Sequence, residues 1–197
     1  MEITPRQLEI IEATGKILTT SGVSRLTIKN LAKEMQFSES AIYRHFESKE
    51  EILLMMLQYL RYNITLIKSS LSKTDDVEKD FCMFFQKLSK FFNANPYFAV
   101  AVFSEGLLDE NEKLNKEIMG LMSMFYGYLQ SIIAEGQNQH IFLPSISAGD
   151  LTMVVIATFK HYMFSWKFDK FNSDLLVSIH KMCAQLLTLM KNNPTQS

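Results

Sequence analysis

Residues 24–53 constrain the fold more than any other stretch of this chain, because they carry the pattern of two short helices, a tight turn and the start of a third helix. Thr27 and Ser38 each stand directly before a short helical pattern, and both residue types commonly cap helix N-termini. Too few residues separate the two patterns for anything longer than a turn. The stretch therefore predicts a helix-turn-helix unit, whose second helix enters the major groove of DNA.

Helical spacing of apolar residues continues through the remaining sequence and predicts an all-α fold of about nine helices. Of the 197 residues, 47% are hydrophobic and only 7 are glycine and 4 proline, so a large core with few interruptions is expected. The expected helices span residues 5–21, 28–35, 39–45, 49–71, 74–94, 96–108, 111–135, 147–168 and 173–191.

Local signals predict several helix ends. Ser48 and Glu51 form the pattern of a capping box, in which each side chain accepts a hydrogen bond from the other residue's backbone amide. Residues 136–145 are expected to form a loop, and Asn172 or Ser173 is expected to cap the last helix.

Several classes of protein do not fit this sequence. No run of about 18 uncharged apolar residues occurs, and the N-terminus lacks the apolar segment of a secretory signal. We therefore expect no membrane span and a cytoplasmic protein, in which Cys82 and Cys183 are free, buried thiols.

An enzyme is not expected either. The four histidines are scattered without metal-ligand or catalytic spacing, and the chain has no nucleophile elbow, phosphate-binding glycine loop or C-x-x-C pair. The sequence therefore predicts neither catalysis nor a metal or cofactor site.

Basic residues gather in one part of the chain, although the net charge of the whole is only −1. Residues 16–49 carry six basic and three acidic side chains, a local charge of +3. A small basic head on a neutral body suits a protein that binds DNA through one domain.

Residues 10–53 resemble the DNA-binding domain of bacterial tetracycline-repressor-type (TetR/AcrR) transcriptional regulators. The matching residues are Ile10, Ala13, Gly22, Thr27, Ile28, Leu31, Ala32, Phe37, Ser38, the run 42–46 and the run 48–53. Gln36 departs from the family, which usually has glycine there, and a left-handed backbone at this residue would cost about 1 kcal/mol. Glu39 and Ser40 also depart, since many members carry lysine and glycine at these positions.

The resemblance implies a DNA-binding domain over residues 1–48 and a ligand-binding and dimerisation domain over 49–197, linked by the helix at 49–71. It implies a ligand-responsive regulator, acting as a repressor, that binds palindromic double-stranded operator DNA as a homodimer. The dimer contact is implied on helices 147–168 and 173–191, although burial within one protomer would equally explain their apolar residues. From the residues alone, a helical protein-interaction module without DNA binding is the alternative.

Nine residues are the candidate DNA contacts. Hydroxyl groups at helix starts can meet phosphate oxygens, and lysines can bind them as point charges. Arg44 could read guanine through a forked pair of hydrogen bonds or clamp a phosphate, and His45 could bond a phosphate or the protein's own backbone. The candidates are Thr27, Lys29, Ser38, Ser40, Ala41, Tyr43, Arg44, His45 and Lys49.

For the effector, the resemblance implies a pocket among the central helices. A soft lining of aromatic and methionine side chains suits a small hydrophobic or aromatic molecule, although the same side chains commonly fill a core. The candidate ligand residues are Tyr62, Phe85, Phe92, Phe103, Met122, Phe125, Tyr126, Phe159, Tyr162 and Trp166.

Overall fold

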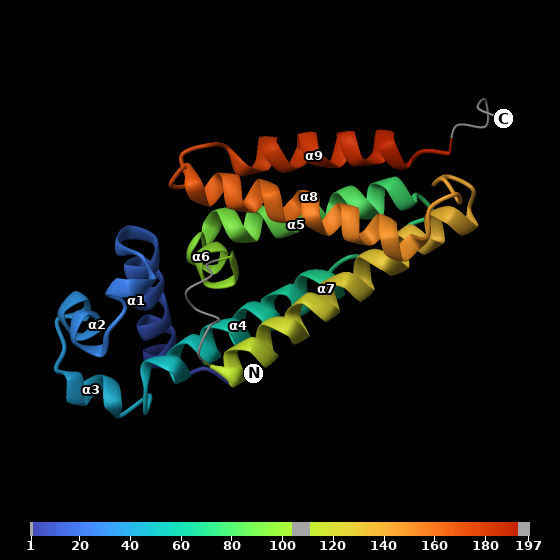
Figure 1. The fold of residues 1–197 in the computed structure, drawn as a ribbon. Helices are drawn as coiled ribbons and strands as arrows, with labels where there is room; N and C mark the ends of the chain where they lie inside the picture. The colour runs from blue at the N-terminus through green and yellow to red at the C-terminus, as the bar shows by residue number, and fades with distance from the viewer. Residues whose placement is uncertain (1, 104–110, 193–197) are drawn as a thin grey trace. The chain divides into compact units, whose positions relative to one another are not determined.

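The structure, a computed structural model, describes residues 2–103 and 111–192 (Figure 1). Within these residues the chain forms nine α-helices and no strand, which confirms the predicted all-α fold. The end of the expected helix 96–108 and the last five residues of the chain lie outside the described part. The helices are α1 (Pro5–Ser21), α2 (Ile28–Met35), α3 (Glu39–Tyr43), α4 (Lys49–Ser69), α5 (Val77–Ala94), α6 (Tyr97–Phe103), α7 (Glu112–Asn138), α8 (Ala148–Phe168) and α9 (Leu175–Met190).

The helices are grouped into two compact units that interleave along the chain. The first unit comprises Met1–Thr65 and Ala94–Gly120, and it contains α1 to α3, most of α4, α6 and the start of α7. The second unit comprises Leu66–Asn93 and Leu121–Ser197, and it contains nearly all of α5, the rest of α7, α8 and α9.

In the first unit, α1 packs closely against α6 at one glycine. A Cβ atom on Gly15 would lie 2.9 Å from the Cβ of Tyr97 and closer still to its ring, so the approach requires glycine. Burial, with smaller contributions from Glu12 and Tyr59, raises the pKa of Tyr97 to about 12. The Tyr97 ring thus stays uncharged where α1 and α6 meet.

In the second unit, four phenylalanines from three helices form an aromatic cluster: Phe84 and Phe85 of α5, Phe125 of α7 and Phe159 of α8. The ring of Phe85 lies 5.3 Å from that of Phe159, and the ring of Phe84 lies 5.5 Å from that of Phe125. Phe125 and Phe159 also contact each other, at 5.6 Å between ring centres. All four side chains are buried, and such rings contribute both apolar area and favourable ring-to-ring geometry to a core.

The start of α4 follows the expected capping box only in part. Ser48 Oγ accepts a hydrogen bond from the Glu51 amide at 3.2 Å, as predicted. The Glu51 carboxylate, however, accepts from the Glu47 amide at 2.6 Å and not from that of Ser48. Both contacts satisfy amide groups at the helix start. The capping differs from the expected box only in the amide that the Glu51 carboxylate accepts from.

The expected loop at 136–145 begins later than predicted, because α7 continues to Asn138. Gln137, in the last turn of this helix, donates from Nε2 to the carbonyl oxygens of Leu143 and Ile146, both at 2.8 Å. The added helical turn therefore holds the loop that follows it.

The last helix is capped by neither Asn172 nor Ser173, and this expectation was wrong. Asp174 caps α9 instead, because its Oδ1 accepts from the Val177 amide at 3.1 Å. The two earlier residues belong to the turn before the helix: Asn172 Nδ2 donates to the Asp169 carbonyl at 2.8 Å, and the Ser173 carbonyl accepts from an indole. Smaller differences concern α3 and α4, which each end two residues before the predicted position.

Candidate nucleic-acid interface

The turn between α2 and α3 is built on Gln36. Its backbone is left-handed, with φ 56° and ψ 39°, as predicted for a position where glycine is usual. The Gln36 amide donates to the Lys33 carbonyl at 3.2 Å, and the Phe37 amide donates to the Ala32 carbonyl at 2.8 Å. These bonds satisfy the last carbonyls of α2 and turn the chain sharply into α3.

α3 and the residues directly after it expose one face and bury the other. Ile42 and Phe46 are buried and anchor the segment in the first unit. Tyr43 is 52% exposed, so its phenol group is accessible to a partner. The exposed side chains of this segment are Ser38, Glu39, Ser40, Tyr43, Arg44 and His45, and Ala41 is half-buried.

Several exposed polar side chains of this face lack partners within the protein. The side chains of Lys29, Tyr43, Arg44 and His45 make no hydrogen bond or ion pair with any residue in ranges 2–103 and 111–192. Lys49 lies 3.6 Å from Glu50, a surface pair of little energetic weight. These groups are therefore available to an anionic partner without loss of a strong internal bond.

The two predicted caps are present and remain accessible. Thr27 Oγ1 accepts from the Asn30 amide at 3.1 Å, and Ser38 Oγ accepts from the Ala41 amide at 3.2 Å. Ser40 Oγ lies 2.9 Å from Ser38 Oγ, within hydrogen-bond distance. Both capping residues are exposed, so each hydroxyl can meet a phosphate oxygen while it caps its helix.

The structure adds one basic residue that the sequence did not single out as a contact. Lys33 is exposed and lies one turn after Lys29 on α2, so the two side chains share a face. The i, i+4 spacing was the available signal. Lys16, by contrast, forms an ion pair with Glu34, so part of the basic charge counted in the sequence is already neutralised.

The ten predicted ligand residues are divided between the two units. Tyr62 and Phe103 belong to the first unit and the other eight to the second. Trp166 donates from Nε1 to the Ser173 carbonyl at 3.0 Å, and Tyr162 Oη is hydrogen-bonded to Gln185 Oε1 at 3.1 Å. In the second unit Phe85, Phe92, Phe125, Phe159 and Trp166 are buried, and Met122, Tyr126 and Tyr162 are half-buried.

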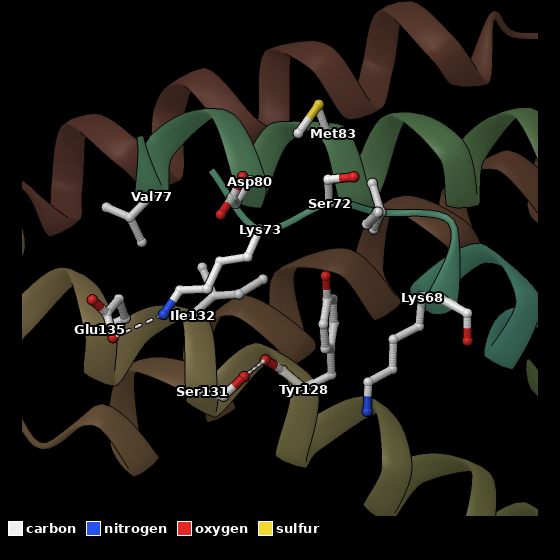
Figure 2. Close-up of a pocket in the computed structure, with 12 residues that line it drawn as sticks. Lys68, Ser72, Lys73, Val77, Asp80, Met83, Tyr128, Ser131, Ile132 and Glu135 are labelled. Carbon is white, nitrogen blue, oxygen red and sulfur yellow. Dashed lines mark hydrogen bonds and ion pairs between the residues drawn. The ribbon is translucent and has the colours of Figure 1, made fainter. Parts of the chain in front are cut away.

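A cavity of about 470 Å³ does open in the second unit, between α5, α7 and the segment that joins α4 to α5 (Figure 2). None of the ten predicted residues lines it. Lys68 Nζ lies 5.3 Å from the centre of the Tyr128 ring, and Lys73 Nζ lies 3.3 Å from the Glu135 carboxylate. The Tyr128 ring in turn contacts Phe84 at 4.7 Å, so the cavity adjoins the aromatic cluster.

The cavity brings together residues that are remote in sequence, which explains why sequence patterns did not reveal it. A hydrogen bond from Gln139, followed by a hydrogen bond from Lys73 and its charge, lowers the pKa of Glu135. Burial raises the pKa of Tyr128, with a further contribution from Asp80. The wall thus presents two lysine ammonium groups, the carboxylates of Asp80 and Glu135, a neutral phenol and apolar surface side by side.

Helices α8 and α9 pack side by side (Figure 1). Large apolar side chains on both helices are exposed to solvent. Phe168 is 80% exposed and Val177 is 65% exposed. Most other apolar residues of α9, such as Ile179 and Leu186, are buried within the protomer. The exposed large apolar residues on these helices are Met153, Val154, Phe164, Phe168, Leu176, Val177 and Leu189.

None of the helices in the described ranges has the length and apolar character that a membrane crossing needs.

Comparisons with known proteins agree with this geometry. The family model of bacterial regulatory proteins of the tetR family matches residues 10–56. The nucleoid occlusion factor SlmA of Vibrio campbellii is 31% identical over 134 residues, which are 67% of this chain and 68% of that protein.

Two solved structures share the fold at low sequence identity. The fatty acid degradation regulator FadR of Bacillus halodurans superposes with a TM-score of 0.83 at 19% identity, over 98% of this chain and 100% of that one. FadR of Bacillus subtilis, solved in complex with stearoyl-CoA, superposes with a TM-score of 0.77 at 16% identity, over 92% of this chain and 97% of that one.

The chain belongs to the tetR family of bacterial regulatory proteins. It is a helix-turn-helix DNA-binding regulator, and the family and its solved neighbours are transcriptional regulators and not enzymes.

Proposed function

We propose that this protein is a ligand-responsive repressor that binds palindromic operator DNA as a homodimer. The observation that carries the proposal is the exposed face of α3 and its C-terminal end, where the side chains of Tyr43, Arg44 and His45 have no hydrogen-bond or ion-pair partner in the part of the chain that the structure describes. In this role Arg44 forks onto the O6 and N7 atoms of guanine, while Lys29 and Lys49 bind phosphates.

Two copies of this head are needed because one short helix reads only a few base pairs. Two-fold helix-turn-helix dimers bind half-sites about 34–36 Å apart, one turn of the DNA helix. We place the dimer contact on α8 and α9, where the exposed apolar residues would otherwise remain in water.

We assign DNA binding to residues 1–48, and effector binding and dimerisation to residues 49–197. α4 follows α3 after a few residues and is one continuous helix from Lys49 to Ser69, so a displacement at one end reaches the other. An effector that favours one arrangement of the helices shifts the population away from the DNA-binding one. A coupling of about 1–3 kcal/mol is typical of such regulation.

The effector site we propose is the cavity shown in Figure 2 together with the adjoining aromatic cluster. Three of the ligand residues named from sequence, Phe85, Phe125 and Phe159, belong to this aromatic cluster. Their rings must move to admit a molecule. Lys68 and Lys73 suit a negatively charged end. The neighbour FadR of Bacillus subtilis was solved with stearoyl-CoA, an acyl chain on an anionic carrier, and an effector with the same two parts fits here.

A second candidate function comes from the relatives named nucleoid occlusion factors, which are about 30% identical to this chain. Both functions require DNA binding, and the distribution of binding sites in the source genome separates them. A few sites at promoters support the repressor. Many sites outside promoters, with division across the nucleoid after deletion of the gene, support nucleoid occlusion.

The assignment of roles within α3 is tested with Arg44→Ala and Lys49→Ala. Loss of a forked guanine contact should reduce the preference of Arg44→Ala for operator over random DNA by about 1–3 kcal/mol. Lys49→Ala should weaken binding to both DNAs alike, because a phosphate contact carries no sequence information. Titration of labelled DNA at fixed salt measures both effects, and Lys116→Ala, an exposed lysine on α7, is the matched control. Equal losses on operator and random DNA for both variants would contradict the assignment.

A further inference from the structure

The two cysteines of this chain lie 101 residues apart in sequence but meet in the structure. Cys82 belongs to α5 and Cys183 to α9, and both line one groove of about 400 Å³ in the second unit. Cys82 is half-buried, whereas Cys183 is 3% exposed. Neither forms a disulfide in this structure.

The two thiols influence each other's ionisation. A side-chain hydrogen-bond interaction between them is the largest influence on the pKa of each thiol. Both side chains line the same groove between α5 and α9. A disulfide requires the two sulfurs to approach across this groove to about 2.0 Å.

The two thiols differ in reactivity, and the difference follows from their surroundings. The hydrogen bond from Cys183 lowers the pKa of Cys82, against the opposing effects of burial and of the Glu78 and Asp76 carboxylates. The same hydrogen bond, with burial, raises the pKa of Cys183. Since the thiolate is the nucleophile, the more accessible Cys82 reacts first, and Cys183 reacts only in the step that follows.

Basic side chains frame the entrance to this pair. Lys79 and Lys90 of α5 and His180 of α9 line the same groove and are exposed. The groove is therefore lined by exposed polar side chains, and a small polar oxidant can reach the half-buried Cys82 through it. Cys82 lies on α5, outside the exposed apolar residues of α8 and α9 that form the proposed dimer contact, and Leu176 belongs both to that set and to the groove.

We propose that Cys82 and Cys183 form a peroxide-reactive dithiol that oxidises to a disulfide joining α5 to α9. In the first step the Cys82 thiolate attacks the O–O bond of a hydroperoxide, which yields Cys82 sulfenic acid and, after proton uptake, an alcohol or water. In the second step the Cys183 sulfur attacks the Cys82 sulfur and expels water. The sum is two thiols and one hydroperoxide to one disulfide, one alcohol or water, and one further water.

The reverse reaction needs a reductant of the thiol class. Two equivalents of a low-molecular-weight thiol return both cysteines to the reduced form by thiol–disulfide exchange. The disulfide would place a covalent restraint on α9, which also carries the apolar side chains of the proposed dimer contact. The chemistry itself is independent of the proposed operator binding, so either idea can fail without the other.

The direct test treats the reduced full-length protein with a small excess of hydrogen peroxide and follows intact mass and free thiols. The expected result is a mass lower by two hydrogen atoms, simultaneous loss of both thiols, a single-chain band on a non-reducing gel, and recovery after dithiothreitol. Retention of both thiols in peroxide that oxidises the urea-unfolded protein would overturn the proposal. Gain of oxygen without loss of the two hydrogen atoms, or a covalent dimer on the gel, would overturn it equally.

Two single variants test the order of the steps. Cys183→Ser should stop at the sulfenic acid, seen as a gain of one oxygen atom that dimedone traps at Cys82. Cys82→Ser should lose its remaining thiol about tenfold more slowly than the wild type, because Cys183 is buried and protonated. The double variant Cys82→Ser/Cys183→Ser measures the background gain of oxygen from methionine oxidation, because Met83 also lines the groove. This background is subtracted from the result of each single variant. Equal rates of thiol loss in Cys82→Ser and in the wild type would contradict the assigned roles.

Discussion

Among single residues, Gln36 shows how the backbone conformation of one residue sets the turn between α2 and α3. Its left-handed conformation lets the α2 carbonyls be satisfied and sends the chain into α3 at the required angle. A residue with a Cβ is strained in this region, so the protein retains the turn at a cost in stability. The exposed side chains of Tyr43 and Arg44 depend on that turn for their direction.

Gln36→Gly should relieve this strain and raise the free energy of unfolding by about 0.5–1 kcal/mol, after allowance for the greater freedom of glycine in the unfolded chain. Thermal unfolding should show a midpoint higher by about 1–4 °C. Gln36→Val is the control variant with the opposite expected effect. A β-branched residue is disfavoured even more strongly in the left-handed region, so this variant should lower the midpoint. A lower midpoint for the glycine variant would show that the Gln36 side chain stabilises the turn by some other contact.

At the level of helices, sequence signals were most informative where the physics is local. The caps at Thr27 and Ser38 and the left-handed backbone of Gln36 depend only on neighbours within a few residues, and the structure confirms each. The cap of α9 at Asp174 was missed because three consecutive residues there are acceptable caps, and the indole of Trp166 decides among them by holding the turn.

Groupings of side chains from distant helices could not be predicted in the same way. Lys68 and Tyr128 share a cavity, and Cys82 and Cys183 share a groove, only because tertiary packing brings their helices together. The aromatic residues proposed as a ligand lining illustrate the converse problem. Their aromatic and methionine side chains suit a ligand lining, but the same side chains commonly fill a core, and residue type does not distinguish a filled core from an open pocket.

The exposed apolar stripe of α8 and α9 leads to a prediction for these helices. Val177→Asp should leave the protomer folded, because the side chain is already 65% exposed, but it should weaken the dimer by about tenfold or more as two carboxylates meet at the two-fold contact. Sedimentation over a range of concentrations measures the change. Met119→Asp, at a 68% exposed position on α7, is the control. A monomeric wild type, or a Val177→Asp dimer of unchanged affinity, would contradict the placement of the contact.

For the protein as a whole, the distribution of charge matters more than its sum. The chain has a net charge of −1, so it has no general attraction for nucleic acid. The attraction for DNA must come from the few basic side chains near α2 and α3, above all Lys29, Arg44 and Lys49. A dimer presents each of these side chains twice. This concentration of charge in two heads makes salt dependence a direct measure of how many phosphates the protein contacts.

The central claim is that paired α3 helices hold operator DNA through these side chains. Its most direct test selects bound fragments from the source genome and then measures the affinity of the wild-type protein for one such fragment at a series of salt concentrations. About four phosphate contacts in a dimer, from Lys29 and Lys49 of each protomer, predict a log–log slope of roughly −4, together with tighter binding to the selected fragment than to random DNA. A slope near zero and no enriched fragment, as expected of a helical interaction module, would contradict the account.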